Sequence, residues 1–532
     1  MSAQLENNHI LFLATLAFGG LLAAFTVAKR WHTTSPPPPP GPPSYPLIGS
    51  WLSLPRCAPW IAYVKWSRDY DSDLVSFNAF GQRSVIVNTA KAAQVLLEQR
   101  SAIYSDRPTW TVIDLSGWDW FLGFMPYSER WRVRRRIFRK TLGEQVCPEY
   151  RPIQYKMAEN MIKWLYSDPK DFQRYMSLTA AWLTLSLAWG YDAKPHDDPI
   201  VEKTEVAVAM AVQNTMPGAS VLNEIPLLSR LPHWFPGMGY KLRASECKTL
   251  TNEILHGPIK AVKQSLADGT AGISIASKLL REGGLDFQAE MAIAESVGSV
   301  FSGESGYEHQ IRDVANLPLF VYPAGAETTG GTLHFVVHGL VLNPHVQRCA
   351  QEEIDRVVGR GRLPRLDDRP ALPYVGAILR ESMRWHTVVP LGLPHKTTED
   401  DIYDGYLIPK GTMVFGNIWA ITHDPEKYED PTSFKPERFL QNDGTLNDDE
   451  APAVFGFGRR VCPGKCIADS SLWIAVASLL AVFDLNLAKD GDGNMIPVKD
   501  AVTEGLTSRP QPFECSIVPR DSTAEALIKS LA

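Results

Sequence analysis

The residues best suited to chemistry lie near the C-terminus, in the segment Phe455-Gly456-Phe457-Gly458-Arg459-Arg460-Val461-Cys462-Pro463-Gly464. Its glycines permit a tight turn and a close backbone approach, so the turn can present the sulfur of Cys462 to a metal from a rigid position. Backbone N–H groups in such a turn can donate to the sulfur, and the N-terminus of the apolar helix predicted to follow favours its negative charge. Arg460 stands two residues before the cysteine and is placed to meet an anionic group beside that metal.

A second set of residues combines one glutamate with two arginines. Glu381 and Arg384 share one face of a helix predicted over residues 375–385. Arg438 follows in the segment 434–439, twenty-four residues before Cys462. A Glu–Arg pair at this spacing is by itself a weak surface ion pair. If buried and multiply hydrogen-bonded, the same residues would instead fix the loop that carries the cysteine.

An acid and a hydroxyl stand side by side in Ala324-Gly325-Ala326-Glu327-Thr328-Thr329. A small residue and a glycine would let a helix approach a flat ligand closely, and Glu327 with Thr328 could pass protons to a metal-bound oxygen. Without the cysteine segment, the stretch would be read as an ordinary amphipathic helix. Pro318 and Pro323 precede it, and because each would remove a helical hydrogen bond, the geometry of this helix stays open.

Together these motifs resemble those of the cytochromes P450. The cysteine segment matches F-x-x-G-x-R-x-C-x-G throughout, and the resemblance covers about residues 45–520. It implies haem b (iron protoporphyrin IX) with the Cys462 thiolate as the axial ligand of the iron. It also implies that Glu327 and Thr328 deliver protons and that Glu381, Arg384 and Arg438 form a buried structural triad. The implied cofactor-binding residues are Cys462, Trp131, Arg135, His395, Arg460, Phe455, Gly458 and Gly464.

The same resemblance implies where a substrate would bind. A loop over residues 104–127 is rich in aromatic side chains, and residues 506–508 are expected to close the pocket. Aromatic residues at this density usually belong to a core, but as a group they predict a bulky, lipophilic substrate with few charges. The implied pocket residues are Trp118, Phe121, Phe320, Ala324, Val389 and Leu391.

The elements that must position these residues are mostly helices. Hydrophobic periodicity predicts helices over 90–100, 345–358 and 470–483, and short strands over 74–79, 84–88 and 412–415. The expected fold class is mainly α with small peripheral β-sheets, in one catalytic domain over residues 45–532. Two partial motif matches are excluded. Residues 359–361 open like a dinucleotide-binding loop but lack the third glycine, and residues 490–494 start like an EF-hand loop but lack its later ligands.

The N-terminus has a different character. Residues 10–28 form an uncharged apolar run that would span roughly 28 Å as a helix, close to the thickness of a bilayer core. This predicts a membrane anchor over residues 1–30, and residues 31–44 form a proline-rich hinge. A cleaved signal peptide fits poorly because Glu6 replaces a basic n-region. Basic residues after the span and an acid before it favour a single span with the catalytic domain in the cytosol. The resemblance, which is to P450s of the fungal, microsomal type, implies that the membrane is that of the endoplasmic reticulum.

Charge and cysteine content limit the partners. The net charge of −6 gives no general attraction to nucleic acid, and seven scattered cysteines do not form a disulfide framework. Residues 130–140, however, include seven basic side chains among eleven, more than a cofactor's carboxylates need. The outer side of this predicted helix is expected to dock an acidic electron-donor protein. The resemblance implies NADPH–cytochrome P450 reductase as that donor, with cytochrome b5 as an accessory one, so that NADPH acts only indirectly.

The resemblance implies a haem-thiolate monooxygenase that inserts one oxygen atom from O₂ into a lipophilic substrate, with secondary-metabolite biosynthesis as the expected role. Broad oxidation of xenobiotics is one alternative. A second is a related haem enzyme whose chemistry is not oxygenation, although it would not need the Glu327–Thr328 pair. A third is a zinc protein that uses Cys462 and Cys466, but no second ligand pair accompanies them.

Overall fold

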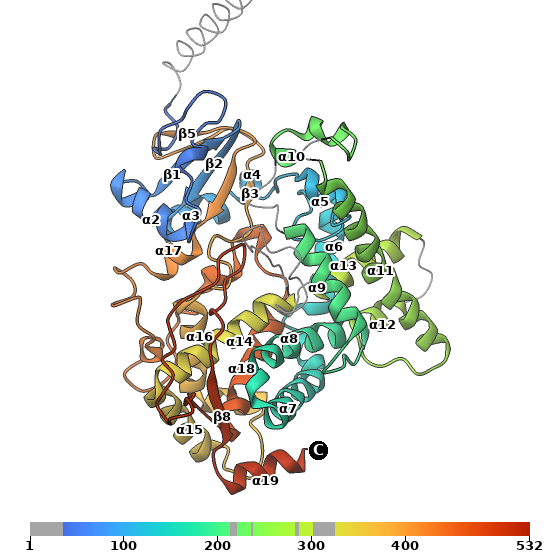
Figure 1. Ribbon diagram of the computed structural model, residues 1–532, viewed down its shortest axis with the longest axis vertical. Coiled ribbons are helices and arrows are strands. Elements are labelled where there is room, and N and C mark those ends of the chain that lie inside the picture. Colours follow the sequence, from blue (N-terminus) through green and yellow to red (C-terminus); the bar gives the residue numbers. More distant parts are fainter. Residues whose placement is uncertain (1–35, 213–220, 236–237, 282–286, 302–324, 532) are drawn as a thin grey trace, which may run out of the picture.

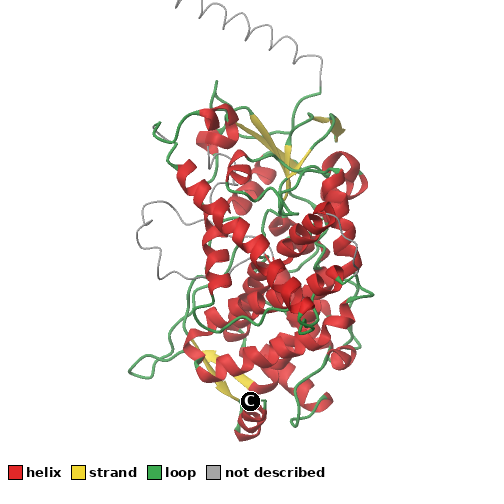
Figure 2. Cartoon of the chain, turned by 90° about the vertical axis from the view of Figure 1, so that its right-hand side faces the viewer, coloured by secondary structure: helices red, strands yellow, loops and turns green. Residues whose placement is uncertain are grey.

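The computed structural model describes residues 36–212, 221–235, 238–281, 287–301 and 325–531. The predicted membrane span (10–28) and the residues Pro318, Phe320, Pro323 and Ala324 lie outside these ranges. The prediction of a mainly helical fold is confirmed: helices dominate, and the strands gather in small sheets near the two ends of the molecule (Figure 2).

The longer helices make up most of the molecule. They are α2 (Pro59–Asp69), α6 (Glu129–Leu142), α7 (Arg151–Ser167), α8 (Phe172–Trp189), α9 (Pro199–Val212), α11 (Tyr240–Ala267), α13 (Phe287–Phe301), α14 (Gly325–Leu342), α15 (Pro344–Val357), α16 (Pro373–Trp385) and α18 (Lys465–Val482). Shorter helices are α3 (Ala90–Ala93), α4 (Ser101–Tyr104), α5 (Thr111–Leu115), α10 (Val221–Glu224), α12 (Ile275–Leu280), α17 (Ile418–Thr422) and α19 (Ser522–Ser530). A π-helical stretch, η2 (Gln94–Gln99), continues α3, so the helix predicted over 90–100 changes its hydrogen-bonding pattern partway along.

The strands form three small sheets. They are β1 (Leu74–Ala79), β2 (Gln82–Val87), β3 (His395–Lys396), β4 (Asp401–Tyr403), β5 (Tyr406–Ile408), β6 (Met413–Gly416), β7 (Phe483–Leu487) and β8 (Cys515–Pro519). The largest sheet has the order β1-β2-β6-β3, with β1 and β2 antiparallel and β6 parallel to β2, so that Ser84 lies beside Met413. The other two sheets are the pairs β4-β5 and β7-β8.

Helices α8, α14, α16 and α18 lie together in the middle of the helical region (Figure 1). Small residues let α14 approach α8 closely: Ala326 packs on Ala180 and Ala181, and a Cβ at Gly330 would lie 3.1 Å from the Ser177 Cα. Because α14 carries Glu327 and Thr328, this close packing fixes where those side chains stand.

Helix α18 is apolar on nearly all sides, as its sequence predicted. It is the one described helix that is long and apolar enough to cross a membrane, but 72% of it is buried inside the protein. This burial identifies α18 as a core helix that follows the cysteine segment directly.

The described part of the predicted proline hinge belongs to the folded domain. The Ser76 backbone N–H and hydroxyl donate to the carbonyls of Pro40 and Pro39, and the Leu407 N–H donates to the Pro37 carbonyl at 2.8 Å. A Cβ at Gly41 would lie 1.7 Å from the Ser76 carbonyl oxygen, so only glycine fits there. Prolines cannot donate hydrogen bonds, but their carbonyls accept them along β1 and β5. Residues 37–41 are therefore held against β1 and β5.

Two of the seven cysteines lie side by side. Cys466, in the first turn of α18, is in contact with Cys147, which lies 319 residues away in the sequence. The other five cysteines are free. The sequence could not indicate this pair, because only the packing of α18 against the segment before α7 brings the two residues together.

Candidate active site

An interior cavity of about 320 Å³ collects most of the predicted site residues. Side chains from α6, α8, α13, α14 and the start of α18 line it, together with loops that follow α16 and precede α18. Its lining includes Phe121, Trp131, Arg135, Thr328, Val389, His395, Phe455, Arg460, Cys462 and Gly464.

The cysteine segment forms a tight turn at one wall of this cavity. The Cys462 N–H donates to the Phe455 carbonyl at 2.8 Å, which closes the turn, and α18 begins three residues after the cysteine. Burial raises the pKa of the Cys462 thiol, whereas the backbone N–H groups of Gly464 and Lys465 and the charge of Arg135 lower it. The protein thus supplies donors for a thiolate, and a metal at this position would supply the remaining stabilisation.

Two glycines meet the steric needs of this turn in different ways. Gly458 has φ of +53°, and a Cβ there would lie 2.3 Å from the Leu97 carbonyl oxygen, so the turn packs directly against η2. Gly464 has ordinary φ, and its Cβ would lie 3.9 Å from Cys462 Sγ, a normal contact distance. Gly464 instead borders the cavity, where a side chain would take space from a ligand.

Arg460 is held firmly but is not fully paired. Its Nε donates to the Ser105 carbonyl at 2.7 Å and its Nη2 to the Met125 carbonyl at 2.9 Å, while its buried Nη1 has no partner in the described structure. Its guanidinium lies 4.4 Å from the ring centre of Trp131. Burial lowers the pKa of Arg460 to about 9.

Two further hydrogen-bond donors, a neutral histidine and a second arginine, line the cavity. His395 Nδ1 donates to the Tyr104 carbonyl at 2.6 Å, and burial together with Arg107 and Arg460 lowers its pKa well below the usual value. Arg107, which the sequence reasoning missed, is 4% exposed, and its guanidinium donates to the Gly123, Leu393 and Pro394 carbonyls. Like charges at this density are costly unless an anion joins them.

These observations test whether haem fits the cavity. A cluster of buried cations that includes an unpartnered Arg460 Nη1 suits the carboxylates of haem propionates. Cys462 also lines the cavity, and its sulfur is the ligand that a haem iron would take. Arg135 lies near both Cys462 and Arg460, lines the cavity, and donates from Nη2 to the Val461 carbonyl at 2.7 Å. The residues present therefore fit the cofactor.

Glu381 is the centre of a buried ionic network. Arg384 binds it through two hydrogen bonds of 2.6 and 2.8 Å, Arg438 Nε lies 3.2 Å away, and the Lys435 backbone N–H donates at 2.7 Å. The side chains of Glu381 and Arg384 are 0% exposed, whereas that of Arg438 is 11% exposed. The remaining donors of Arg384 reach the carbonyls of Thr422, Pro431 and Ser433. The network thus fixes the segment from 422 to 438.

Glu327 and Thr328 take different positions. Thr328 lines the cavity, whereas Glu327 lies behind the wall and accepts a hydrogen bond of 3.3 Å from the hydroxyl of Thr507, which does line it. Burial raises the pKa of Glu327 to about 7, although the charge of Arg509 and the Thr507 hydroxyl oppose this. A carboxyl group with this pKa can both give and take a proton near neutral pH.

The basic residues of α6 have distinct uses. The buried Arg134 and the partly exposed Arg130 both bind Glu295 of α13, with Arg130 Nη2 lying 2.9 Å from Glu295 Oε1. Arg132 and Arg136 are exposed and share the carboxylate of Glu129 at 3.3 and 3.2 Å. Residues 139 and 140 are exposed at the end of the same helix. The basic residues of α6 therefore divide into some that bind α13, one that lines the cavity and several that form an exposed surface.

Two predicted pocket residues pack elsewhere. Trp118 stacks on Trp120 with ring centres 5.2 Å apart in the main core, because the loop turns its ring away from the cavity. Leu391 belongs to the apolar cluster between α2 and the main sheet. Sequence reasoning identified the loop but not the direction of each side chain. Lining residues that it missed include Leu122, Leu183, Thr184, Leu187, Ser299, Val300, Thr332 and Thr387.

Cys466 lies against Cys147 and does not line the cavity that Cys462 faces, so the two cysteines of the zinc alternative are not presented to one site. Within the described ranges, the one cluster of three or more metal-ligating side chains comprises His338, His386 and Asp500, none of which lines the cavity.

Comparison with known proteins agrees with this geometry. The family model described as Cytochrome P450 matches residues 39–517. The chain is 34% identical to the tryptamine 4-monooxygenase of Psilocybe cyanescens, over 98% of this chain and 100% of that protein. It is 36% identical to the cytochrome P450 monooxygenase COX1 of Coprinopsis cinerea, over 92% of each chain. It is 37% identical to the cytochrome P450 monooxygenase 208 of Postia placenta, over 95% of each.

Proposed function

We propose that this chain, which belongs to the cytochrome P450 family and is a monooxygenase, oxidises a bulky, uncharged, lipophilic substrate with electrons from NADPH that a separate reductase delivers. The observation that carries the proposal is the cavity, in which Cys462 faces a largely apolar space with buried cations at one side. When bound there, haem supplies dioxygen activation and the transfer of one oxygen atom.

The lining supports an uncharged substrate. Apolar side chains from α8, α13 and the loop after α16 face threonine and serine hydroxyls, and none of the described residues that line the cavity carries a carboxylate. The name of the Psilocybe relative describes a protein that acts on tryptamine, an amine. The described lining offers no carboxylate to such an amine, which favours a neutral scaffold of the kind found among secondary metabolites.

Proton supply is assigned to the wall formed by α14 and the C-terminal loop. The Thr507 hydroxyl lies between the Glu327 carboxyl and the cavity, and Thr328 reaches the cavity from the next position on α14. We infer that Glu327 takes a proton from the protein interior and gives it to the cavity through Thr507, with Thr328 orienting the acceptor.

The outer face of α6 is the proposed docking surface for the electron donor. Arg136 is 68% exposed and Arg132 is 51% exposed, and the helix ends with two more exposed basic residues, Arg139 and Lys140. The inner face of the same helix reaches the cavity and, through Arg135, the cysteine turn. An acidic donor bound here would therefore lie close to the thiolate side of the site.

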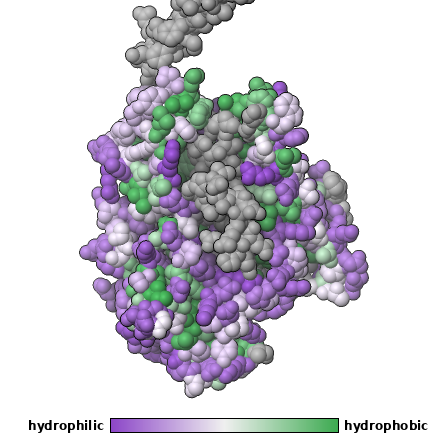
Figure 3. Space-filling view, in the orientation of Figure 1, coloured by the Kyte–Doolittle hydropathy of each residue, from purple (hydrophilic) through white to green (hydrophobic). Residues whose placement is uncertain are grey.

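A position at the endoplasmic reticulum membrane, with a cytosolic catalytic domain, is part of the proposal. In addition to the predicted anchor over residues 1–30, the chain has exposed apolar side chains at Leu47 (92%), Leu227 (64%) and Trp234 (74%). The segments that carry them lie toward one end of the molecule with β1 and α10 (Figure 1). Elsewhere, the face in Figure 3 is mainly hydrophilic with separate apolar patches. A membrane surface at this end would cover these side chains.

The test combines a spectrum with turnover. Membranes containing the full-length chain should give the red-shifted Soret band of a thiolate-ligated haem in a reduced, carbon-monoxide difference spectrum. With reductase and NADPH, product should carry one ¹⁸O atom from ¹⁸O₂. Cys462→Ser should abolish both signals, and its retained turnover would refute the ligand assignment. Product formation without NADPH or O₂ would instead support haem chemistry other than oxygenation.

A further inference from the structure

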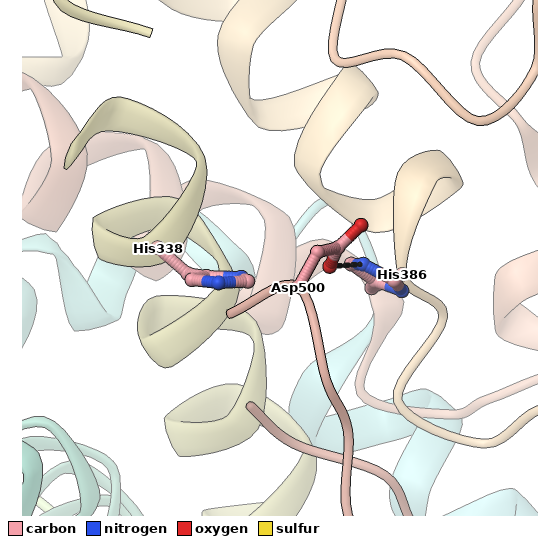
Figure 4. Close-up of side chains that lie close together, drawn as sticks. All are labelled: His338, His386 and Asp500. Carbon is pink, nitrogen blue, oxygen red and sulfur yellow. Dashed lines mark hydrogen bonds and ion pairs between the residues drawn. The ribbon is translucent and has the colours of Figure 1, made fainter. Parts of the chain in front are cut away.

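Two histidines and one aspartate meet outside the cavity, where α14, the end of α16 and the C-terminal loop come together (Figure 4). One ligand atom from each of His338, His386 and Asp500 lies within 4.8 Å of the others. We propose that these three side chains bind a divalent metal ion of the zinc class. Imidazole and carboxylate are the ligands that such ions take in proteins, and three protein ligands leave one position for water.

The outer part of this cluster is already assembled. His386 Nε2 and Asp500 Oδ1 lie 2.8 Å apart, and their side chains are 16% and 48% exposed. A metal therefore has a path from solvent to the pair, and it would replace the proton that the two groups now share. His386 is held in place by Phe335, whose ring centre lies 4.9 Å away.

The inner ligand, His338, has an unused nitrogen. The residue is 0% exposed, its Nε2 lies 3.3 Å from the Lys499 carbonyl oxygen, and its buried Nδ1 has no hydrogen-bond partner within the described ranges. A neutral imidazole that donates one N–H to a carbonyl keeps a lone pair on the other nitrogen, which is the state a metal ligand requires. Stacking on Trp385, with ring centres 5.5 Å apart, fixes the plane of the ring.

The three ligand atoms would fit a tetrahedral metal ion if they moved slightly closer together. Ligand atoms around a tetrahedral zinc ion, at bond lengths of about 2.0–2.1 Å, lie roughly 3.3 Å apart. His386 Nε2 and Asp500 Oδ1 are 2.8 Å apart, and the three ligand atoms all lie within 4.8 Å of one another. Asp500 belongs to a loop, so it can move by the ångström that is needed. In Figure 4 the ring of His338 points toward that loop.

A plain histidine–aspartate hydrogen bond is the competing explanation. It accounts for His386 and Asp500, but not for the third ligand atom, from the buried His338, that lies within 4.8 Å of them. A bound metal accounts for all three side chains. It would also join α14 and α16 to the loop that continues to Leu506 and Thr507, which line the cavity. The proposed ion would thereby restrain one wall of the substrate site without touching it.

The experiment measures zinc on the haem-loaded protein. The purified holoenzyme is freed of loosely bound metal with a chelator and dialysed against graded Zn²⁺, and bound zinc is counted relative to iron, which reports the haem. We expect one zinc per iron, and a rise in the melting temperature with Zn²⁺. Asp500→Asn and His386→Gln should each weaken zinc binding by at least tenfold. The control His256→Gln, at an exposed histidine of α11, should bind as the wild type does.

Asp500→Asn changes an exposed side chain with little change in size, so an unaltered carbon-monoxide spectrum will show that this variant is folded. X-ray absorption at the zinc edge should show only nitrogen and oxygen ligands. Sulfur ligands would point to the exposed Cys57 or Cys349 and overturn the proposal. So would equal zinc binding by Asp500→Asn and the wild type, or no binding by either. Because zinc is counted without substrate or reductase, this result is independent of the proposed function.

Discussion

Replacing Glu381 by glutamine should lower the free energy of unfolding by more than the loss of any single exposed ion pair would. The substitution keeps the size of the side chain but removes the negative charge from an acceptor of four hydrogen bonds. Arg384, whose side chain is 0% exposed, would then keep its charge without a compensating partner. Breaking a buried ion pair from one side costs about 3–5 kcal/mol, which corresponds to roughly 10²–10⁴-fold in the folding equilibrium.

The assay is chemical denaturation of the holoenzyme, followed by the haem absorbance and by tryptophan fluorescence. A matched control is Asp367→Asn, which removes the carboxylate from an exposed pair in which Asp367 lies 2.8 Å from Arg151 and is 74% exposed. That change should cost less than about 1 kcal/mol. If Glu381→Gln costs no more than the control, the network does not hold the segment from 422 to 438, and the reasoning fails.

Three further predictions concern the site. Glu327→Gln should leave the free energy of unfolding unchanged near pH 4.5 but raise it at pH 8 by up to about 3 kcal/mol. Burial raises the pKa of the Glu327 carboxyl from 4.5 to about 7, so the wild-type protein carries a costly buried charge above that pH. Parallel pH–stability curves for the two proteins would contradict this. Gly458→Ala should displace the cysteine turn and lower the haem content, because the added Cβ would lie 2.3 Å from a carbonyl oxygen. The control Gly444→Ala, at a position with positive φ but open space, should lower the free energy of unfolding by only about 1–2 kcal/mol. Equal haem content in the two variants would contradict the steric account. Exchanging Arg136 and Arg139 for glutamate should raise the reductase concentration needed for half-maximal turnover, and more strongly at low salt. The carbon-monoxide spectrum should be unchanged. A salt-independent effect would exclude α6 as the docking surface.

Most of the site residues and elements that could be predicted belong to short motifs. The cysteine turn, the Glu381–Arg384 pair and the spacing of Trp131 and Arg135 each depend on residues close together in the sequence, whose geometry follows from one turn or one helix. The strand over 74–79 and the helix over 375–385 follow from their hydrophobic pattern for the same reason.

What could not be predicted depends on contacts between distant segments. Thr507 lies 180 residues from Glu327, and nothing near either residue indicates that they meet. The ring of Trp118 and the side chain of Leu391 were assigned to the pocket because of their neighbours, but packing directs them into other clusters. Arg107 carries no spacing signal, since its three acceptors are backbone carbonyls.

During synthesis, β6 leaves the ribosome long after β2, the strand it pairs with. Gln82 of β2 donates to the Gly411 carbonyl, 329 residues later in the chain. At roughly 5–20 residues per second, this gap corresponds to roughly 15–65 s of translation. Throughout that interval the open edge of β2 can pair with another nascent chain. We therefore expect chains that stop before residue 413 to aggregate, and coexpressed chaperones that hold unfolded chains to raise the yield of the complete protein.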